Sequence, residues 1–169
     1  MWSSSVGKLV LADFYVVEPS NLNRQHYLVS HIGMYKADAL RESIAQINPY
    51  VEVESMVVRL DEANALEVFG SVQVLAEAFD TQAAKSMLLK TFRKHRPDLP
   101  LVTVSGLAGY GPANRIQTRR LLKNLYLVGD EETAARPGMG LMAPRVGIAA
   151  SHQANAVLRL MLGLEPDED

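Results

Sequence analysis

Residues 72–105 have the sequence VQVLAEAFDTQAAKSMLLKTFRKHRPDLPLVTVS, and this stretch decides the fold. Its first part, Val72–Phe79, is mostly apolar and ends at Asp80, which is typical of a buried strand. Apolar residues recur at helical spacing over about Thr81–His95, and Leu101–Val104 is again apolar. A helix between two buried strands favours a parallel strand pair with the helix packed on one face.

The alternation of strands and helices continues on both sides of this stretch. We expect further strands at Lys8–Ala12 and Val51–Leu60, and helices at about Gly33–Ile47, Asp61–Gly70 and Val146–Leu162. Residues 106–145 are rich in Gly and Pro and mostly irregular, with a candidate strand pair around 114–118 and 124–128. The predicted fold class is therefore α/β, with a mainly parallel sheet and helices on its faces.

The chain has 169 residues and a formal net charge of −2, with 48% hydrophobic and 21% charged residues. These values predict one globular domain, residues 1–163, followed by a frayed acidic tail, residues 164–169. The balanced charge disfavours a nucleic-acid platform, and every apolar run is well short of the roughly 18 residues of a membrane span. Because the chain has no cysteine, disulfides, thiolate zinc sites and a cysteine nucleophile are excluded, which fits a cytoplasmic protein.

Polar residues follow three of the predicted strands, namely Asp13, Asp80 and Ser105. Ligands of parallel α/β sheets bind beyond the carboxyl ends of the strands. Parallel strands would therefore place these three side chains along one rim. The alternative for Asp13 and Asp80 is a role in capping turns, for which Asp is common at strand ends.

The loop after Asp13 has a composition suited to anion binding. Residues 18–25 are EPSNLNRQ, which places two Asn side chains and the Arg24 guanidinium close together. Arg is suited to bidentate contact with phosphate. Lys36 falls in the first turn of the next helix, where a cation is unfavourable unless it faces an anion. Either cation taken alone could instead be a solvated surface residue.

A lone catalytic role for one of the four histidines is a further alternative, the candidates being His26, His31, His95 and His152. His26 and His31 lie in the same loop and are expected at the surface. His152 lies in an apolar helix and is expected to be a hydrogen-bonded core residue.

Four short motifs give this chain a resemblance to a known family. They are Ser20-Asn21-Leu22-Asn23-Arg24-Gln25, Ile32-Gly33, Lys36-Ala37 and Ile47-Asn48-Pro49. Together they resemble the ThiF, MoeB and HesA family, relatives of the ubiquitin-activating enzymes. Within that family the chain is most similar to the short subgroup of ThiF, the adenylyltransferase for the thiamine sulfur carrier protein. The resemblance runs from about residue 6 to residue 163, includes the segments 77–80, 105–111 and 140–146, and implies a Rossmann-like nucleotide-binding domain.

The resemblance implies an enzyme that uses ATP and Mg²⁺ to adenylate the C-terminal glycine of a ubiquitin-like sulfur carrier protein ending in Gly-Gly. Asp13 would hold the ribose, Asn21 would contact the phosphates, and Asp80 would carry Mg²⁺. Arg24, Lys36 and Asp80 would act in catalysis. The nucleotide-binding residues that it implies are Asp13, Ser20, Asn21, Asn23, Arg24, Gln25, Lys36, Asp80 and Thr81. It also implies a homodimer, and the charge balance and short apolar runs predict no nucleic-acid or membrane partner.

The sequence departs from the family pattern near its start. The family begins with a strand and a Gly-x-Gly-Gly-x-Gly loop that cradles the nucleotide, whereas Gly7 is the only glycine among the twelve residues before Asp13. We therefore expect a form that is truncated relative to the family, without that strand and loop, and that binds Mg·ATP weakly on its own. Two alternatives remain open. One is a non-catalytic carrier-binding or assembly module of the same family, and the other is a nicotinamide dehydrogenase, which Asp13 permits but the pair Arg24 and Lys36 disfavours.

Overall fold

The structure is a computed structural model that describes residues 6–167. The predicted domain start at residue 1 and the last two residues of the predicted tail, 168–169, lie outside the described residues. The strands are β1 (Lys8–Ala12), β2 (Glu52–Met56), β3 (Leu75–Ala76), β4 (Leu101–Ser105), β5 (Gln117–Leu122) and β6 (Leu125–Gly129). The α-helices are α1 (Lys36–Ile47), α2 (Ala65–Phe69), α3 (Gln82–His95) and α4 (Ala143–Met161). Between residues 6 and 167 the connections also hold three single-turn 3-10 helices, η1 (Pro19–Asn21), η2 (Val29–His31) and η3 (Ala113–Arg115).

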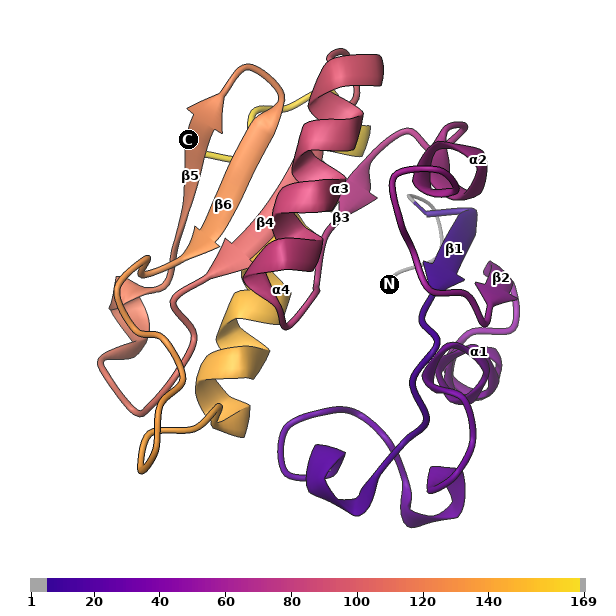
Figure 1. Ribbon diagram of the computed structural model, residues 1–169, viewed down its shortest axis with the longest axis vertical. Coiled ribbons are helices and arrows are strands. Elements are labelled where there is room, and N and C mark those ends of the chain that lie inside the picture. The colour runs from indigo at the N-terminus through magenta and orange to yellow at the C-terminus, as the bar shows by residue number, and fades with distance from the viewer. Residues whose placement is uncertain (1–5, 168–169) are drawn as a thin grey trace.

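The strands form two sheets (Figure 1). β1 and β2 form a two-stranded parallel sheet, and the second sheet has the order β3-β4-β6-β5. β3, β4 and β6 are parallel to one another, and only β5 is antiparallel, to β6. The prediction of an α/β fold with a mainly parallel sheet is confirmed. What the sequence did not predict is that β1 and β3 belong to separate sheets.

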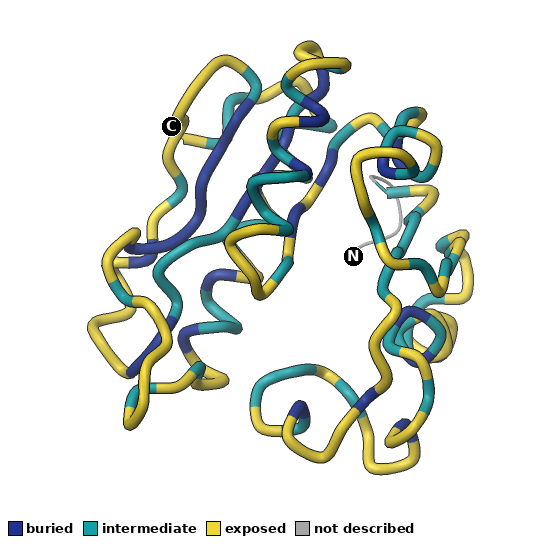
Figure 2. Tube along the Cα trace, in the orientation of Figure 1, coloured by how far each residue is buried: buried dark blue, intermediate teal, exposed yellow. Residues whose placement is uncertain are grey.

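The core lies on both faces of the four-stranded sheet. Alternate residues of a strand point to opposite faces, and Leu101 packs in a cluster with Leu88 and Phe92 of α3. Its neighbour Val102 packs in a second cluster with Ala149 of α4. Val10 and Ala12 of β1 pack against the first cluster, so the two sheets share one core. Figure 2 shows this burial along β4 and β6, and shows that the loops around η1 and η2 are largely exposed.

Two predicted elements are shorter because loop contacts replace their ends. The helix expected from Gly33 begins at Lys36, because Gly33 has a φ of +87° and its N–H donates to the Val17 carbonyl at 2.9 Å. The strand expected at Val72–Phe79 is limited to Leu75–Ala76, and the Phe79 N–H donates to a side chain instead of a neighbouring strand.

Other boundaries differ for similarly local reasons. The helix expected at Asp61–Gly70 is only Ala65–Phe69, because the Asp61 carboxylate accepts the Ala63 and Asn64 N–H groups and stabilises a turn. The predicted strand Val51–Leu60 is Glu52–Met56, and the candidate strand pair lies slightly later, in β5 and β6. The last helix starts at Ala143 instead of Val146, with Pro144 in its first turn, a favourable position for proline.

The described part of the acidic tail is held in place, so the expectation of a frayed tail is wrong for these residues. The Tyr126 hydroxyl donates to Glu165 Oε2 at 2.5 Å, and the Arg120 N–H donates to Asp167 Oδ2 at 3.2 Å. Burial, and next the Glu165 carboxylate, raise the pKa of Tyr126 to about 12. No helix among residues 6–167 is both long and apolar enough to span a membrane.

Candidate functional site

Asp13 follows β1 and fixes the start of the next loop. Its backbone N–H donates to the Met56 carbonyl at 3.2 Å, and its Oδ1 accepts the Tyr15 N–H at 2.8 Å. Burial, and to a lesser extent the Asp13 charge, raise the pKa of Tyr27 to about 12. The Tyr27 side chain is therefore near enough to Asp13 to be affected by its charge, so the loop returns toward Asp13 before α1 begins.

The loop of residues 18–25 is built around Asn21. This side chain is buried, and its Oδ1 accepts the Glu18 N–H at 2.9 Å, so it holds the turn that η1 forms. The Arg24 guanidinium donates only to uncharged oxygens, the Ser20 carbonyl at 3.2 Å and Asn23 Oδ1 at 2.9 Å. Within residues 6–167 it has no carboxylate partner, so its charge is available to an anion. The Gln25 Oε1 atom is buried without a hydrogen-bond partner in the same part of the chain.

Lys36 is the first residue of α1 and is a second cation without a carboxylate partner among the described residues. Its N–H donates to the Tyr15 carbonyl at 2.9 Å, and its Nζ lies 5.6 Å from the centroid of the Tyr15 ring. Because Asp13 binds the N–H of the same tyrosine, Asp13 and Lys36 are brought together at Tyr15. A helix N-terminus repels a cation, so this position is explained more readily by an anion nearby.

Asp80 lies on the exposed turn between β3 and α3. Its carboxylate has no hydrogen-bond or ion-pair partner within the described chain. The cap of α3 is Thr81, whose Oγ1 accepts the Ala84 N–H at 3.3 Å, so the alternative of Asp80 as a helix cap is not observed. The residues that the structure describes contain no group of three or more His, Asp or Glu side chains that could hold a metal. A free carboxylate fits Mg²⁺ only if phosphate oxygens and water supply the other ligands.

The predicted rim is divided between the two sheets. Asp13 follows β1, whereas Asp80 lies four residues beyond β3, and Ser105 is the last residue of β4. In Figure 1 the loops with η1 and η2 lie beside α1, and the β3–α3 turn lies across from them. The structure thus joins Asp13 and Lys36 at one end of the two-stranded sheet, and no hydrogen bond connects them to Asp80 within residues 6–167.

One expectation about the loop was wrong. His31 is buried, not at the surface, and its Nδ1 accepts the Leu28 N–H at 3.1 Å. This bond satisfies the Leu28 N–H at the start of η2. His26 is exposed, as expected. His152 is hydrogen-bonded as expected, with its Nδ1 3.2 Å from Thr118 Oγ1, but it is only half-buried instead of lying in the core.

Sequence reasoning missed a buried polar cluster at the end of β3. Glu77 is fully buried, and the Lys85 Nζ lies 2.9 Å from its Oε1 and 3.1 Å from its Oε2. The Thr103 hydroxyl of β4 donates to the same carboxylate, and Oε1 also accepts the Phe79 N–H at 2.5 Å. The signal available in the sequence was an acidic residue within an apolar run, four residues after Gln73 and just before the predicted site residue Asp80.

A second missed pair is Asp130 and Arg145, at the end of β6. The two side chains are 2.7 Å apart and each is only 3% exposed. Burial raises the pKa of Asp130, but hydrogen bonds from Thr133 and Glu132 and the charge of Arg145 outweigh this effect and lower the pKa. Gly106 has a φ of +74°, and a Cβ there would collide with the Asp130 carboxylate. The strand-end rule that indicated Asp13 would also have indicated Asp130.

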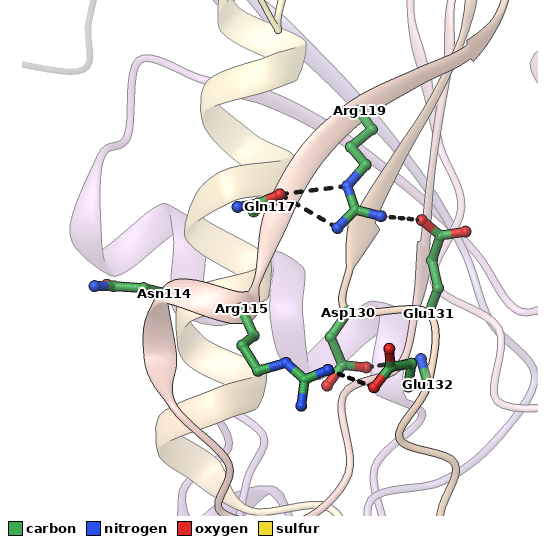
Figure 3. Close-up of a pocket in the computed structure, with 7 residues that line it drawn as sticks. All are labelled: Asn114, Arg115, Gln117, Arg119, Asp130, Glu131 and Glu132. Atoms are coloured by element: carbon green, nitrogen blue, oxygen red, sulfur yellow. Dashed lines mark hydrogen bonds and ion pairs between the residues drawn. The ribbon is translucent and has the colours of Figure 1, made fainter.

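A separate pocket of about 400 Å³ lies between β5 and the segment after β6 (Figure 3). Its lining residues are Asn114, Arg115, Gln117, Arg119, Asp130, Glu131 and Glu132. Arg115 forms an ion pair with Glu132, and Arg119 forms one with Glu131 at 2.5 Å. The four charges of these pairs in the pocket wall therefore neutralise one another. None of the predicted site residues lines this pocket, and its exposed ion pairs give little reason to prefer it as the reaction site.

The parallel strands, with helices on both faces of the four-stranded sheet, define a Rossmann-like type of α/β domain. The sequence profile of the ThiF family matches residues 2–169, and the chain belongs to this family. The "Adenylyltransferase and sulfurtransferase UBA4" of Saccharomyces cerevisiae is 25% identical over 173 residues, covering 98% of this chain and 39% of the relative. The protein of the same name from Yarrowia lipolytica is 26% identical over 166 residues, covering 95% of this chain and 41% of the relative. The chain therefore spans about two-fifths of the length of these curated relatives.

Solved structures share the fold. Escherichia coli tRNA N6-threonylcarbamoyladenosine dehydratase, TcdA, in complex with AMP matches with a TM-score of 0.83 and 22% identity, over 93% of this chain and 76% of that one. Escherichia coli MccB with ATP matches with a TM-score of 0.66 and 18% identity, over 95% of this chain and 50% of that one. At these identities the likeness establishes the Rossmann-like ThiF fold and no more.

Proposed function

We propose that this chain is an adenylyltransferase that transfers AMP from ATP to the C-terminal glycine of a small ubiquitin-like sulfur carrier protein ending in Gly-Gly. The observation that carries the proposal is the pair of cations Arg24 and Lys36, both without a carboxylate partner in the described chain, in the loop region that follows Asp13. Such cations suit a polyanionic ligand such as a triphosphate. Family membership and the names of the UBA4 relatives support the same class of reaction.

The roles follow from the chemistry of each group. The Asp13 carboxylate accepts hydrogen bonds and would bind the ribose hydroxyls, and the Arg24 and Lys36 cations would bind phosphate oxygens. The Asn21 Oδ1 is used inside the loop, which leaves its amide Nδ2 as a donor for the ligand. Ser20, Asn23 and Gln25 would complete the polar lining of the loop. Thr81 caps α3 and places its N-terminal turn next to Asp80.

Mg²⁺ fits Asp80 as a single carboxylate ligand, and when bound it would supply charge neutralisation at the triphosphate. In the reaction, a carboxylate oxygen of the carrier glycine attacks the α-phosphorus of ATP. The bond between that phosphorus and the oxygen bridging to the β-phosphate breaks, and pyrophosphate leaves with the electron pair. No proton transfer is needed, so the chain's contribution is to orient the two anions and to offset their repulsion.

We further propose the thiamine pathway as the source of the carrier, a homodimer as the assembly and the cytoplasm as the location. These follow from the family resemblance and from the balanced charge and absence of cysteine in the sequence. The catalysed step ends at the adenylate, because without a cysteine the chain has no thiol of its own to form a thioester with the carrier.

Carrier-dependent exchange of labelled pyrophosphate into ATP tests the proposal. The chain is incubated with millimolar ATP, Mg²⁺ and a thiamine-pathway sulfur carrier, and the matched control is the same carrier without its last glycine. We expect exchange with the intact carrier only. Binding of the carrier without any exchange would reject adenylation and favour a non-catalytic carrier-binding module.

A further inference from the structure

The Glu77 carboxylate joins three parts of the chain in one buried cluster. It accepts hydrogen bonds from Lys85 of α3, from Thr103 of β4 and from the backbone N–H of Phe79. Its own carbonyl accepts Gln153 Nε2 of α4 at 2.9 Å, and the same amide nitrogen donates to the Val102 carbonyl at 2.9 Å. A buried carboxylate with this number of partners is fixed in position.

The cluster brackets the turn that carries Asp80. On one side of Asp80, the Phe79 N–H is held by Glu77 Oε1 at 2.5 Å. On the other side, the Thr81 carbonyl accepts the Lys85 N–H at 3.1 Å, and Lys85 is the residue whose side chain pairs with Glu77. The exposed carboxylate of Asp80 therefore stands on a short turn whose two ends are tied to one buried ion pair.

Charge burial makes this arrangement costly unless every partner is present. The Glu77 side chain is 0% exposed and the Lys85 side chain 14% exposed. Buried ion pairs are a poor source of net stability, because apolar residues of similar volume pack as well without the desolvation cost. The Glu77–Lys85 pair is therefore explained better by the conformation that it imposes on the turn at Asp80 than by a gain in stability.

We propose that Glu77, acting with Lys85, is a positioning residue that sets the place of the Asp80 carboxylate for Mg²⁺ at the triphosphate. The inference rests on the proposed function, in which Asp80 carries the metal. Glu77 itself touches neither substrate nor metal. Its effect is on the affinity for Mg²⁺, since residues that orient a metal ligand, without binding the metal themselves, change the affinity of the site for the metal.

The test uses Glu77→Gln in the full chain, with the exposed Glu67→Gln of α2 as the matched control. Thr103→Val, which removes one hydrogen bond and keeps the side-chain volume, serves as the milder variant if Glu77→Gln does not fold. The first measurement is the Mg²⁺ concentration that gives half-maximal carrier-dependent exchange. The second is the set of backbone amide signals of Phe79, Asp80 and Thr81, with their hydrogen-exchange rates, by NMR.

We expect the half-maximal Mg²⁺ concentration to rise about tenfold in Glu77→Gln and less in Thr103→Val, with exchange restored at saturating Mg²⁺ and the KM for the carrier unchanged. The amides of the turn should shift and exchange faster, and Glu67→Gln should match the parent. A folded Glu77→Gln or Thr103→Val protein with lower Tm but unchanged Mg²⁺ dependence and unchanged turn amides would overturn the inference. A parent without exchange would instead reject the proposed function, and the turn amides would still decide whether Glu77 holds Asp80 in place.

Discussion

The Asp130 carboxylate lies 2.7 Å from the Arg145 guanidinium, and both side chains are almost completely buried. This pair ties the segment after β6 to the first turn of α4, and Arg145 also donates to the Gly106 and Pro112 carbonyls of the loop after β4. Three segments at the carboxyl end of the four-stranded sheet therefore depend on one ion pair. Removing this ion pair should therefore lower the free energy of unfolding of the chain.

Arg145→Met should lower the free energy of unfolding by about 3–5 kcal/mol, because it leaves the Asp130 charge buried without its partner. Urea unfolding at neutral pH measures this loss. The matched control is Arg136→Met, which changes an exposed arginine of the neighbouring loop. Equal stability of the two variants would contradict the role of the pair.

The same site predicts an acid dependence of stability. The pKa of Asp130 is lowered in the folded chain, so its stabilising contribution is present above the ordinary pKa of Asp, about 3.9, and is lost as the pH falls through the lower folded value. The stability difference between the parent and Asp130→Asn should therefore shrink below about pH 4. Urea unfolding of both proteins between about pH 2 and pH 7 measures this difference in unfolding free energy. A difference that stays constant down to about pH 2 would contradict the role assigned to the Asp130 charge.

Tyr27 provides a test of the loop around Asp13 that needs no activity. Its pKa is raised to about 12, by burial first and by the Asp13 charge second. The difference in ultraviolet titration between the parent and Tyr27→Phe should show one tyrosine ionising near this value, and Asp13→Asn should move that ionisation part of the way down. Because the pKa of Tyr27 is higher in the folded chain than its ordinary value of about 10, the neutral phenol stabilises the fold. This contribution is complete below about pH 10 and is lost as the pH rises through the pKa of the folded chain. Ionisation near pH 10 in the parent would show that the loop does not fold back as described.

Asp80→Asn separates a metal role from a structural one. Since Thr81 caps α3, the variant should fold and melt close to the parent. Since a neutral amide is a poor ligand for Mg²⁺, carrier-dependent exchange should fall about tenfold or more. Exchange rates are compared across a Mg²⁺ titration with Glu67→Gln as the control, and near-parental activity throughout would remove Asp80 from the site.

Local pattern was enough to predict β1, α3 and β4, because each has a clear apolar period and ends at a polar residue. It failed at Val72–Phe79, where the run is apolar but both ends make local contacts. The Val72 N–H donates to the Phe69 carbonyl in a turn, and the Glu77 side chain accepts the Phe79 N–H. It also failed for His31, because only the folded loop presents the Leu28 N–H to its ring.

The candidate site was predictable only in part, for a related reason. Asp13 and Lys36 were identified singly from strand-end and helix-start rules, but their meeting at Tyr15 depends on the path of the intervening loop. The partners of Glu77 come from 8 and 26 residues away, and no sequence period connects such positions. Whether Asp13 and Asp80 share one sheet depends on strand pairing, which the alternation of elements alone does not fix.

The most direct test of the proposed site is carrier-dependent pyrophosphate exchange by Arg24→Ala. The control is Arg41→Ala, which removes an exposed arginine of α1 that already pairs with Asp38 at 3.5 Å. Loss of a charge-assisted phosphate contact of about 2 kcal/mol should lower exchange about thirtyfold in Arg24→Ala and leave Arg41→Ala unchanged. Undiminished exchange in Arg24→Ala would contradict the account, because Arg24 would then be a solvated surface cation.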